Sequence, residues 1–142
     1  MRIPRALTLV FGVLVLAGLL AAGYLLSRPR GPVLVEAGLS LDAITPNADG
    51  DADVTQVSYR LRRRADVTIT FEAANGETHV FRQSQPRVRG EYGVLFGGVV
   101  DGFVLPGEEI EGTVERRLLP DGEYRWIIRA TDALTGRVDE RS

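Results

Sequence analysis

The sequence predicts an all-β protein, an antiparallel two-sheet sandwich preceded by one N-terminal transmembrane helix. The helix is predicted from an uncharged apolar run over residues 6–26. The sandwich is predicted from residues 33–142, where short alternating segments are separated by turn-forming residues about every 8–12 positions. Residues 1–5 form a flank before the helix, and residues 27–32, SRPRGP, form a linker too polar for the membrane.

The apolar run is long enough to cross a bilayer. At about 1.5 Å per residue it spans about 30 Å, the thickness of the hydrocarbon core. A cleaved signal peptide is the alternative, with a shorter apolar region and a small-x-small site that Ala21 and Gly23 imitate. The run continues past that site through Tyr24 and two leucines, which favours an uncleaved anchor. Arginines flank both sides, so charge does not set the orientation.

Composition excludes several classes of function. The chain has no cysteine, which excludes a disulfide framework, a thiolate metal site and a cysteine nucleophile. It also has no lysine and only one histidine, His79, which is expected on the surface of a strand. The usual nucleophile–base pairs are therefore lacking, and we expect no enzymatic activity. Residues 28–142 hold 15 arginines and all 19 acids, a net charge of −4 that argues against nucleic-acid binding.

Alternation locates the strands and the core. Tyr124 follows a Pro-Asp-Gly turn, which predicts a tyrosine corner, and Trp126 is expected as the main core anchor. Arg125, Ile127 and Arg129 are expected on a solvated face. The predicted strands are residues 33–44, 54–61, 65–73, 78–82, 90–96 and 119–131. The predicted inward positions are Leu39, Leu41, Ala43, Val57, Tyr59, Leu61, Val67, Ile69, Phe71, Tyr92, Val94, Phe96, Tyr124, Trp126, Ile128 and Ala130.

Oxygen-bearing side chains occur at every second position of one turn, at Asn47, Asp49, Asp51 and Asp53. Such spacing is typical of calcium loops, because a tight turn directs several oxygens towards a hard cation. The turn is not an EF-hand, since alanine and serine stand where that loop needs glycine and glutamate. The alternative is a solvated turn whose side chains cap backbone N–H groups. Calcium is the only cofactor that the sequence suggests.

A glycine-rich passage over residues 97–112 is the longest irregular segment of the predicted domain. Its apolar tip, Phe103, Val104 and Leu105, is a candidate contact patch for a partner. The alternative is a hairpin that packs back on the sandwich.

Four segments together resemble the Ig-like domain of flagellar hook-assembly scaffold proteins and related bacterial surface proteins. They are ITPNADGDADVTQVSYRL, ADVTITFEAANGE, GEYGVLFGG and LLPDGEYRWIIRATDALTG, within residues 39–136. The resemblance implies an Ig-like or fibronectin-like sandwich without catalytic residues. The chain departs from the pattern at Ala48, where a glycine is usual, and at Phe96-Gly97-Gly98, which replaces an aromatic-Asp-Gly. Only residues 137–142 remain for the final strand, so that strand is very short or missing.

The resemblance and the apolar run predict a single-pass protein of the cell membrane, anchored by residues 6–26, with its domain on the extracytoplasmic side. The expected role is contact with an unidentified protein or glycan, or structural spacing. The alternative is an accessory domain of a longer extracytoplasmic enzyme.

Overall fold

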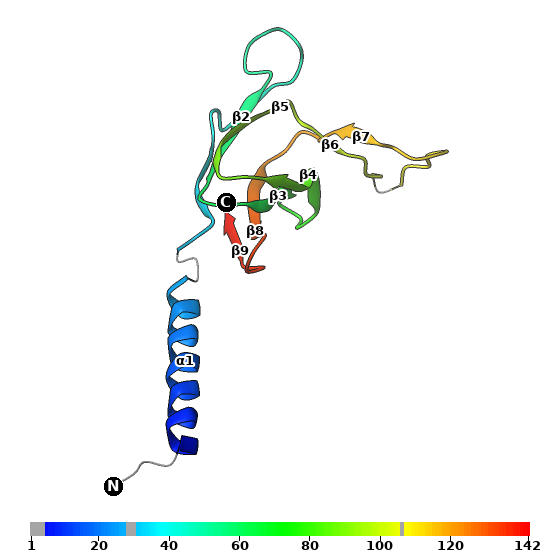
Figure 1. Cartoon of the computed structure of the whole chain (residues 1–142). Helices are drawn as coiled ribbons and strands as arrows, with labels where there is room; N and C mark the ends of the chain where they lie inside the picture. Colours follow the sequence, from blue (N-terminus) through cyan, green and yellow to red (C-terminus); the bar gives the residue numbers. More distant parts are fainter. Residues whose placement is uncertain (1–4, 28–30, 106) are drawn as a thin grey trace. The chain divides into compact units, whose positions relative to one another are not determined.

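The computed structural model describes residues 5–27, 31–105 and 107–142 (Figure 1). The chain divides into two compact units, Met1–Gly31 and Pro32–Ser142. The first contains a helix, and the second contains all of the described strands.

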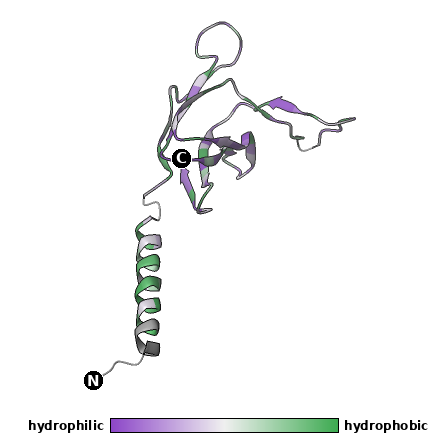
Figure 2. Ribbon diagram, in the orientation of Figure 1, coloured by the Kyte–Doolittle hydropathy of each residue, from purple (hydrophilic) through white to green (hydrophobic). Residues whose placement is uncertain are grey.

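Helix α1 (Arg5–Ser27) forms over the predicted apolar run. Its segment Val10–Ser27 has a mean hydropathy of 2.2 and buries none of its surface within the protein, so the helix is long and apolar enough to cross a membrane. Figure 2 shows hydrophobic residues along much of its length. A signal sequence near the N-terminus would have the same properties, so the choice between anchor and signal peptide stays a prediction.

The second unit is an antiparallel two-sheet sandwich. One sheet has the strand order β1-β2-β5, the other has the order β4-β3-β8-β9, and a small third sheet pairs β6 with β7. The strands are β1 (Leu34–Leu39), β2 (Thr55–Leu61), β3 (Ala65–Ala73), β4 (Thr78–Arg87), β5 (Gly90–Phe96), β6 (Val99–Asp101), β7 (Arg116–Leu118), β8 (Tyr124–Asp132) and β9 (Val138–Arg141).

The core lies between the two large sheets. Val57, Tyr59 and Leu61 of β2 face inwards, as do Val67, Ile69 and Phe71 of β3, and all six are buried. The Phe71 and Phe96 rings stack with centroids 4.1 Å apart and so join the sheets at one end. These strands and inward faces confirm the alternation in the sequence.

Two tyrosine hydroxyls close the turns that precede their strands. The Tyr124 hydroxyl donates to the Pro120 carbonyl oxygen at 2.8 Å, which confirms the predicted tyrosine corner. The Tyr92 hydroxyl makes the same contact, four residues back, with the Val88 carbonyl oxygen at 2.9 Å. This second corner was not predicted from the sequence.

Several elements differ from the expected bounds. Strand β1 ends at Leu39, and the chain then leaves the sheet, so Leu41 and Ala43 are exposed and not inward-facing as predicted. Strand β4 continues through Pro86 to Arg87, which an edge strand tolerates because the missing N–H faces away from the sheet. The final strand, β9, is present as four residues paired with β8.

Burial corrects three expectations. His79 is not a surface residue: it is 5% exposed, with its ring 4.5 Å from that of Phe103. Ile127 is buried although its neighbours Arg125 and Arg129 are exposed as expected. Trp126 is only half-buried and packs at the margin of the core, because it lies near the end of β8.

Candidate functional site

The links between strands carry opposite charges at the two ends of the sandwich. Links 40–54, 74–77 and 119–123 contain seven carboxylates and no arginine, and we call this the acidic end. Links 62–64, 88–89 and 133–137 contain five arginines and no carboxylate, and we call this the arginine end. The strand registers place each group together, since Ala73 pairs with Tyr124 at the first end and Ala65 pairs with Asp132 at the second.

The arginine end is closed by a buried carboxylate. Asp132, 1% exposed, accepts hydrogen bonds from the N–H groups of Leu134 and Thr135 at 2.8 and 3.2 Å and forms an ion pair with Arg63. Burial raises the pKa of Asp132, but the Leu134 N–H and the Arg63 guanidinium outweigh it and hold the pKa below its ordinary value. The buried carboxylate and its three partners therefore stabilise this end of the sandwich.

The turn with the spaced acids lies at the acidic end and is held by its own backbone. The Asp53 carboxylate accepts from the N–H groups of Asn47, Ala48 and Gly50 at 2.7–3.0 Å. These bonds, the one from Gly50 foremost, lower the pKa of Asp53. Asp49 accepts from the Asp51 N–H at 2.9 Å, and this bond lowers its pKa as well. No group of three or more metal-ligating side chains occurs within the described part of the chain.

The same turn contains backbone conformations that favour glycine. Gly50 has a φ of 88°, while Ala48 and Ala52 have φ values of 63° and 50°. An L-residue in this region is strained by about 1–2 kcal/mol. The positive φ of Ala48 therefore destabilises this turn locally.

The glycine-rich passage forms a hairpin arm, residues 99–118, built on β6 and β7, which extends away from the two large sheets in Figure 1. Val100 is fully buried at its base. Arg117 reaches across the arm to Glu108, with contacts of 2.5 and 3.0 Å, and its guanidinium lies 5.4 Å from the centre of the Phe103 ring. The pKa of Glu108 is lowered mainly by this arginine. The arm is thus internally braced.

The candidate contact patch divides within this arm. Phe103 is half-buried against His79 and the core margin, and Leu105 is half-buried beside Glu108, to which its N–H donates at 3.1 Å. Val104 is exposed. Phe103 therefore anchors the arm to the sandwich, and of the three residues only Val104 presents its side chain openly to a partner.

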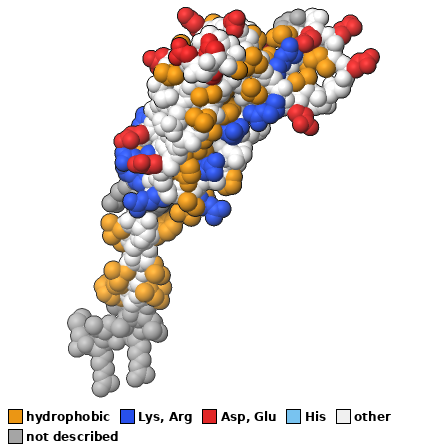
Figure 3. Space-filling view, turned by 90° about the horizontal axis from the view of Figure 1, so that it is seen from above, with side chains coloured by type: hydrophobic (Ala, Val, Ile, Leu, Met, Phe, Trp, Pro, Cys, Tyr) orange, Lys and Arg blue, Asp and Glu red, His pale blue; other side chains and the backbone are white. Residues whose placement is uncertain are grey.

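A second apolar surface was not foreseen from the sequence. We call it the apolar patch and define it as Val54, Leu95, Val99 and Leu118, whose exposed fractions are 46%, 67%, 37% and 48%. Val99 pairs with Leu118 across the arm, and Leu95 lies opposite Gln56, two residues from Val54. The two parts meet at Gly97 and Gly98. A Cβ atom added to Gly97 would lie 3.4 Å from Val54 Cγ1, and one added to Gly98 would lie 3.0 Å from Leu118 Cδ1. In Figure 3, exposed hydrophobic side chains lie beside Asp and Glu side chains near the top of the view.

A pocket of about 560 Å³ opens at the acidic end, between the ends of the two sheets. Its floor includes Phe71 and Phe96, and one wall is the chain segment that follows β1. Because β1 stops at Leu39, the pocket is left uncovered. The remaining lining residues are Leu39, Leu41, Asp42, Ala43, Ile44, Thr55, Leu119, Gly122, Glu123 and Tyr124.

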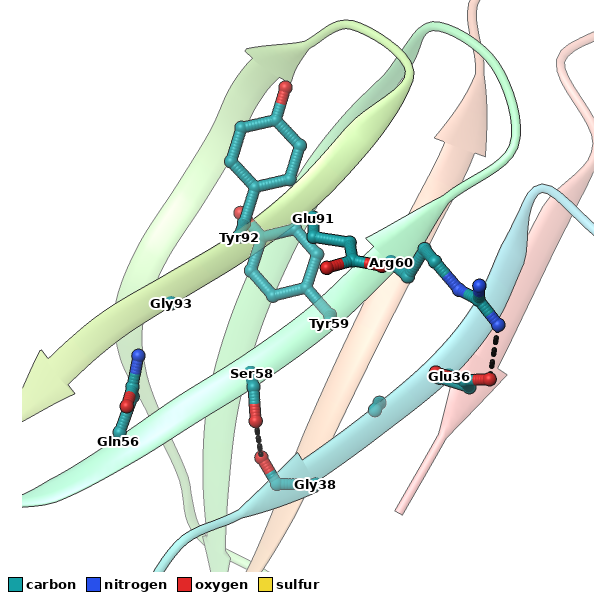
Figure 4. A pocket seen from close by; sticks show the side chains of 10 residues that line it. Glu36, Gly38, Gln56, Ser58, Tyr59, Arg60, Glu91, Tyr92 and Gly93 are labelled. Carbon is teal, nitrogen blue, oxygen red and sulfur yellow. Dashed lines mark hydrogen bonds and ion pairs between the residues drawn. The ribbon is translucent and has the colours of Figure 1, made fainter.

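A shallower groove of about 520 Å³ crosses the outer face of the β1-β2-β5 sheet (Figure 4). Gly38, Ser58 and Gly93 lie in one row across the three strands, so the face is hollowed there. Arg60, which forms an ion pair with Glu36, stands at one side of this row, and Gln56 stands at the other. Tyr59 and Tyr92 contribute little to the groove, because their rings stack on each other at 5.2 Å and Tyr59 is buried in the core.

Comparisons with protein-family models, curated proteins and solved structures give no match to this chain.

Proposed function

We propose that this chain is a single-pass membrane-anchored module whose Ig-like, fibronectin-like domain lies on the extracytoplasmic side and binds another protein. Helix α1 supports the anchor, because it has the length and hydropathy that a bilayer requires. Sandwiches of this class are common in cell-surface proteins, which supports the extracytoplasmic side.

The strand order supports the Ig-like assignment. When β1–β5, β8 and β9 are taken as seven successive strands, the third, sixth and seventh share a sheet, and so do the first, second and fifth. A constant-type Ig domain has these same groupings and places its fourth strand beside the fifth. Here β4 pairs with β3 instead, and the β6–β7 arm is inserted before β8.

The observation that carries the binding role is the apolar patch. Four aliphatic side chains from β5, the arm and the residue before β2 are each more than a third exposed and lie around two adjacent glycines. Isolated exposed leucines are ordinary, but a contiguous apolar surface on a soluble domain marks a protein-contact site. It costs free energy while uncovered, and a partner would remove that cost.

Two further observations favour protein over glycan contact and binding over catalysis. Glycan sites commonly need an open aromatic face, whereas the apolar patch consists of aliphatic side chains alone. His79 is covered by Phe103 and Tyr124 and has no open path to a substrate.

Site-specific photo-crosslinking in intact cells tests the proposal. A benzophenone amino acid placed at Leu118 or Leu95 is expected to give a discrete protein adduct. Leu134 is the matched control, because it is a 79% exposed leucine at the arginine end, outside the patch. Equal yields at all three positions, or no adduct at Leu118 and Leu95, would contradict a binding role for the patch.

A further inference from the structure

We propose that the pocket at the acidic end holds an apolar side chain of the partner polypeptide, and that this side chain is flanked by lysine or arginine. The inference rests on the proposed protein-binding function and adds the chemistry that the partner must present. The shape of the pocket, the rigidity of the pocket walls and the charge at the pocket rim support the inference.

The pocket is large enough to admit an apolar side chain, and its floor is aromatic. Its volume of about 560 Å³ lies within the range of ligand sites, about 300–1,000 Å³. Phe71 and Phe96 stack at 4.1 Å beneath it, and Leu39, Ile44 and Leu119 add aliphatic surface. An aliphatic or aromatic side chain placed there would exchange water for apolar contacts on several sides.

The wall that follows β1 is fixed in place by hydrogen bonds. The buried Thr55 hydroxyl accepts from the Leu41 N–H at 2.9 Å and donates to the Leu41 carbonyl oxygen at 3.0 Å. The Ser40 hydroxyl lies 3.3 Å from the Thr55 hydroxyl oxygen and also accepts from the Gln56 N–H at 2.8 Å. The pocket is therefore preformed, and a partner would not need to order this segment.

The opposite wall is the turn before β8. The Tyr124 hydroxyl bonds back to Pro120 at 2.8 Å and so holds residues 120–124 as a closed loop. Gly122 lines the pocket here, and a Cβ added to it would meet the Tyr124 ring only at 3.6 Å, an ordinary contact. A larger side chain at Gly122 can thus be introduced without a backbone clash.

The rim has a single sign of charge. Asp42 and Glu123 line the pocket, and no arginine is among the described residues that line it. The pKa of Tyr124 is raised by burial first and then by the charges of Glu77 and Asp121, which lie near the same wall. A lysine or arginine beside the inserted apolar side chain would therefore be attracted, and a carboxylate there would be repelled.

The neighbouring surface indicates a polypeptide occupant. Thr55 and Leu119 of the pocket directly follow Val54 and Leu118 of the apolar patch, so the pocket and the patch lie at the same end of the domain, with neighbouring side chains on opposite sides of the chain. A free amino acid would fill the pocket and leave the patch uncovered. A chain segment with an apolar residue between basic residues can fill the pocket and extend around this end to the patch.

Fluorescence anisotropy on the full chain in nanodiscs of neutral lipid tests the proposal, with empty nanodiscs as the blank. Three labelled nonapeptides of otherwise identical sequence carry Lys-Leu-Lys, Glu-Leu-Glu or Lys-Ser-Lys at the centre. We expect saturable binding of the Lys-Leu-Lys probe and at least tenfold weaker binding of each of the others. The first comparison isolates charge, and the second isolates the apolar side chain.

Protein variants locate the binding. Gly122→Leu, which fills the pocket, and the pair Asp42→Asn with Glu123→Gln are each expected to weaken the Lys-Leu-Lys probe at least tenfold. Glu109→Gln with Glu111→Gln removes the same charge from exposed positions of the arm and should leave binding unchanged. Equal melting temperatures for all proteins would show that folding is not the cause.

The proposal is overturned if the Glu-Leu-Glu or Lys-Ser-Lys probe binds as tightly as Lys-Leu-Lys, or if Gly122→Leu retains full binding. Absence of probe binding together with partner adducts at Leu118 would overturn the pocket proposal and leave the protein-binding function standing. Absence of both would overturn the two proposals together.

Discussion

The two ends of the sandwich differ in the length of the links that join their strands. At the arginine end the links are two to five residues long, and Asp132 joins β8 to the β2–β3 turn through Arg63. At the acidic end the β1–β2 link has 15 residues, β6 and β7 form an arm, and a pocket stays open between the sheets. Short links with a buried ion pair leave little free surface, whereas long links leave the space between the sheets open and expose more surface.

This difference separates stability from recognition within one small domain. The sequence divides its charges in the same way, with arginines in one set of links and carboxylates in the other. Changes at the arginine end should therefore act mainly on unfolding, and changes to the pocket at the acidic end should act mainly on binding. Variants at the two ends test this division.

Replacement of Asp132 by asparagine is expected to cost about 3 kcal/mol of unfolding free energy, because it breaks a buried ion pair. The folded-state pKa of Asp132 is lowered, so its contribution is fully present above the unfolded pKa of about 4 and is lost as the pH falls through the folded value. Urea unfolding of the full chain in nanodiscs should thus show a difference in unfolding free energy between wild type and variant. This difference should be constant near neutral pH and become smaller below about pH 4.

The control for this prediction is Glu140→Gln, which breaks an ion pair with Arg129 in which both side chains are about half exposed. Such pairs contribute about 0–1 kcal/mol, so this variant should stay close to wild type. A similar loss in both variants would show that the arginine end has no special part in stability.

In the arm, Phe103→Ala is expected to cost about 2 kcal/mol and Val104→Ala less than about 0.5 kcal/mol. Phe103 packs on His79 and under Arg117, whereas Val104 is exposed. Thermal melts of the two variants measure the difference. Equal and small effects would return Phe103 to the role of an open contact residue.

Ala48→Gly should stabilise the domain by about 0.5–1 kcal/mol, because relief of a positive φ outweighs the greater entropy of glycine in the unfolded chain. Ala37→Gly, within β1 and without a positive φ, is the matched control and should destabilise. A loss of stability in Ala48→Gly would mean that this turn adopts a different backbone conformation in solution.

The smallest effect concerns calcium. The Asp53 and Asp49 carboxylates already accept backbone N–H groups within the turn, so we expect the same melting temperature in millimolar calcium and in chelator. An ion that bound only the folded state at a hundredfold excess over its Kd would add about 2.7 kcal/mol. A rise of that size, removed by Asp49→Ala with Asp51→Ala, would establish the calcium site that the spacing of the acids suggests.

Local patterns were sufficient to predict much of this fold. Strict alternation located β2, β3 and β5, the Asn75-Gly76 pair located the β3–β4 turn, and Pro120-Asp121-Gly122 located the tyrosine corner. Each of these depends on neighbouring residues alone, through side-chain period or turn chemistry. The apolar helix was predictable for the same reason.

The site depends on contacts between distant residues and was mostly not predictable. Alternation continues past Leu39 in the sequence, yet β1 ends there and the Leu41 backbone bonds to the Thr55 side chain instead of a neighbouring strand's backbone. Val99 and Leu118 become one surface only when β6 pairs with β7 across 14 intervening residues, 102–115. His79 is buried by Phe103 from the same arm. No local pattern contains these pairings.

The central claim is that recognition lies at the acidic end and stability at the arginine end. Hydrogen–deuterium exchange of the full chain in nanodiscs, with and without the Lys-Leu-Lys probe, tests it most directly. The account predicts slower exchange in residues 40–54 and 119–123 on addition of the probe, and unchanged exchange in residues 62–64 and 133–137. Slower exchange confined to residues 62–64 and 133–137, or equal slowing at both ends, would contradict it.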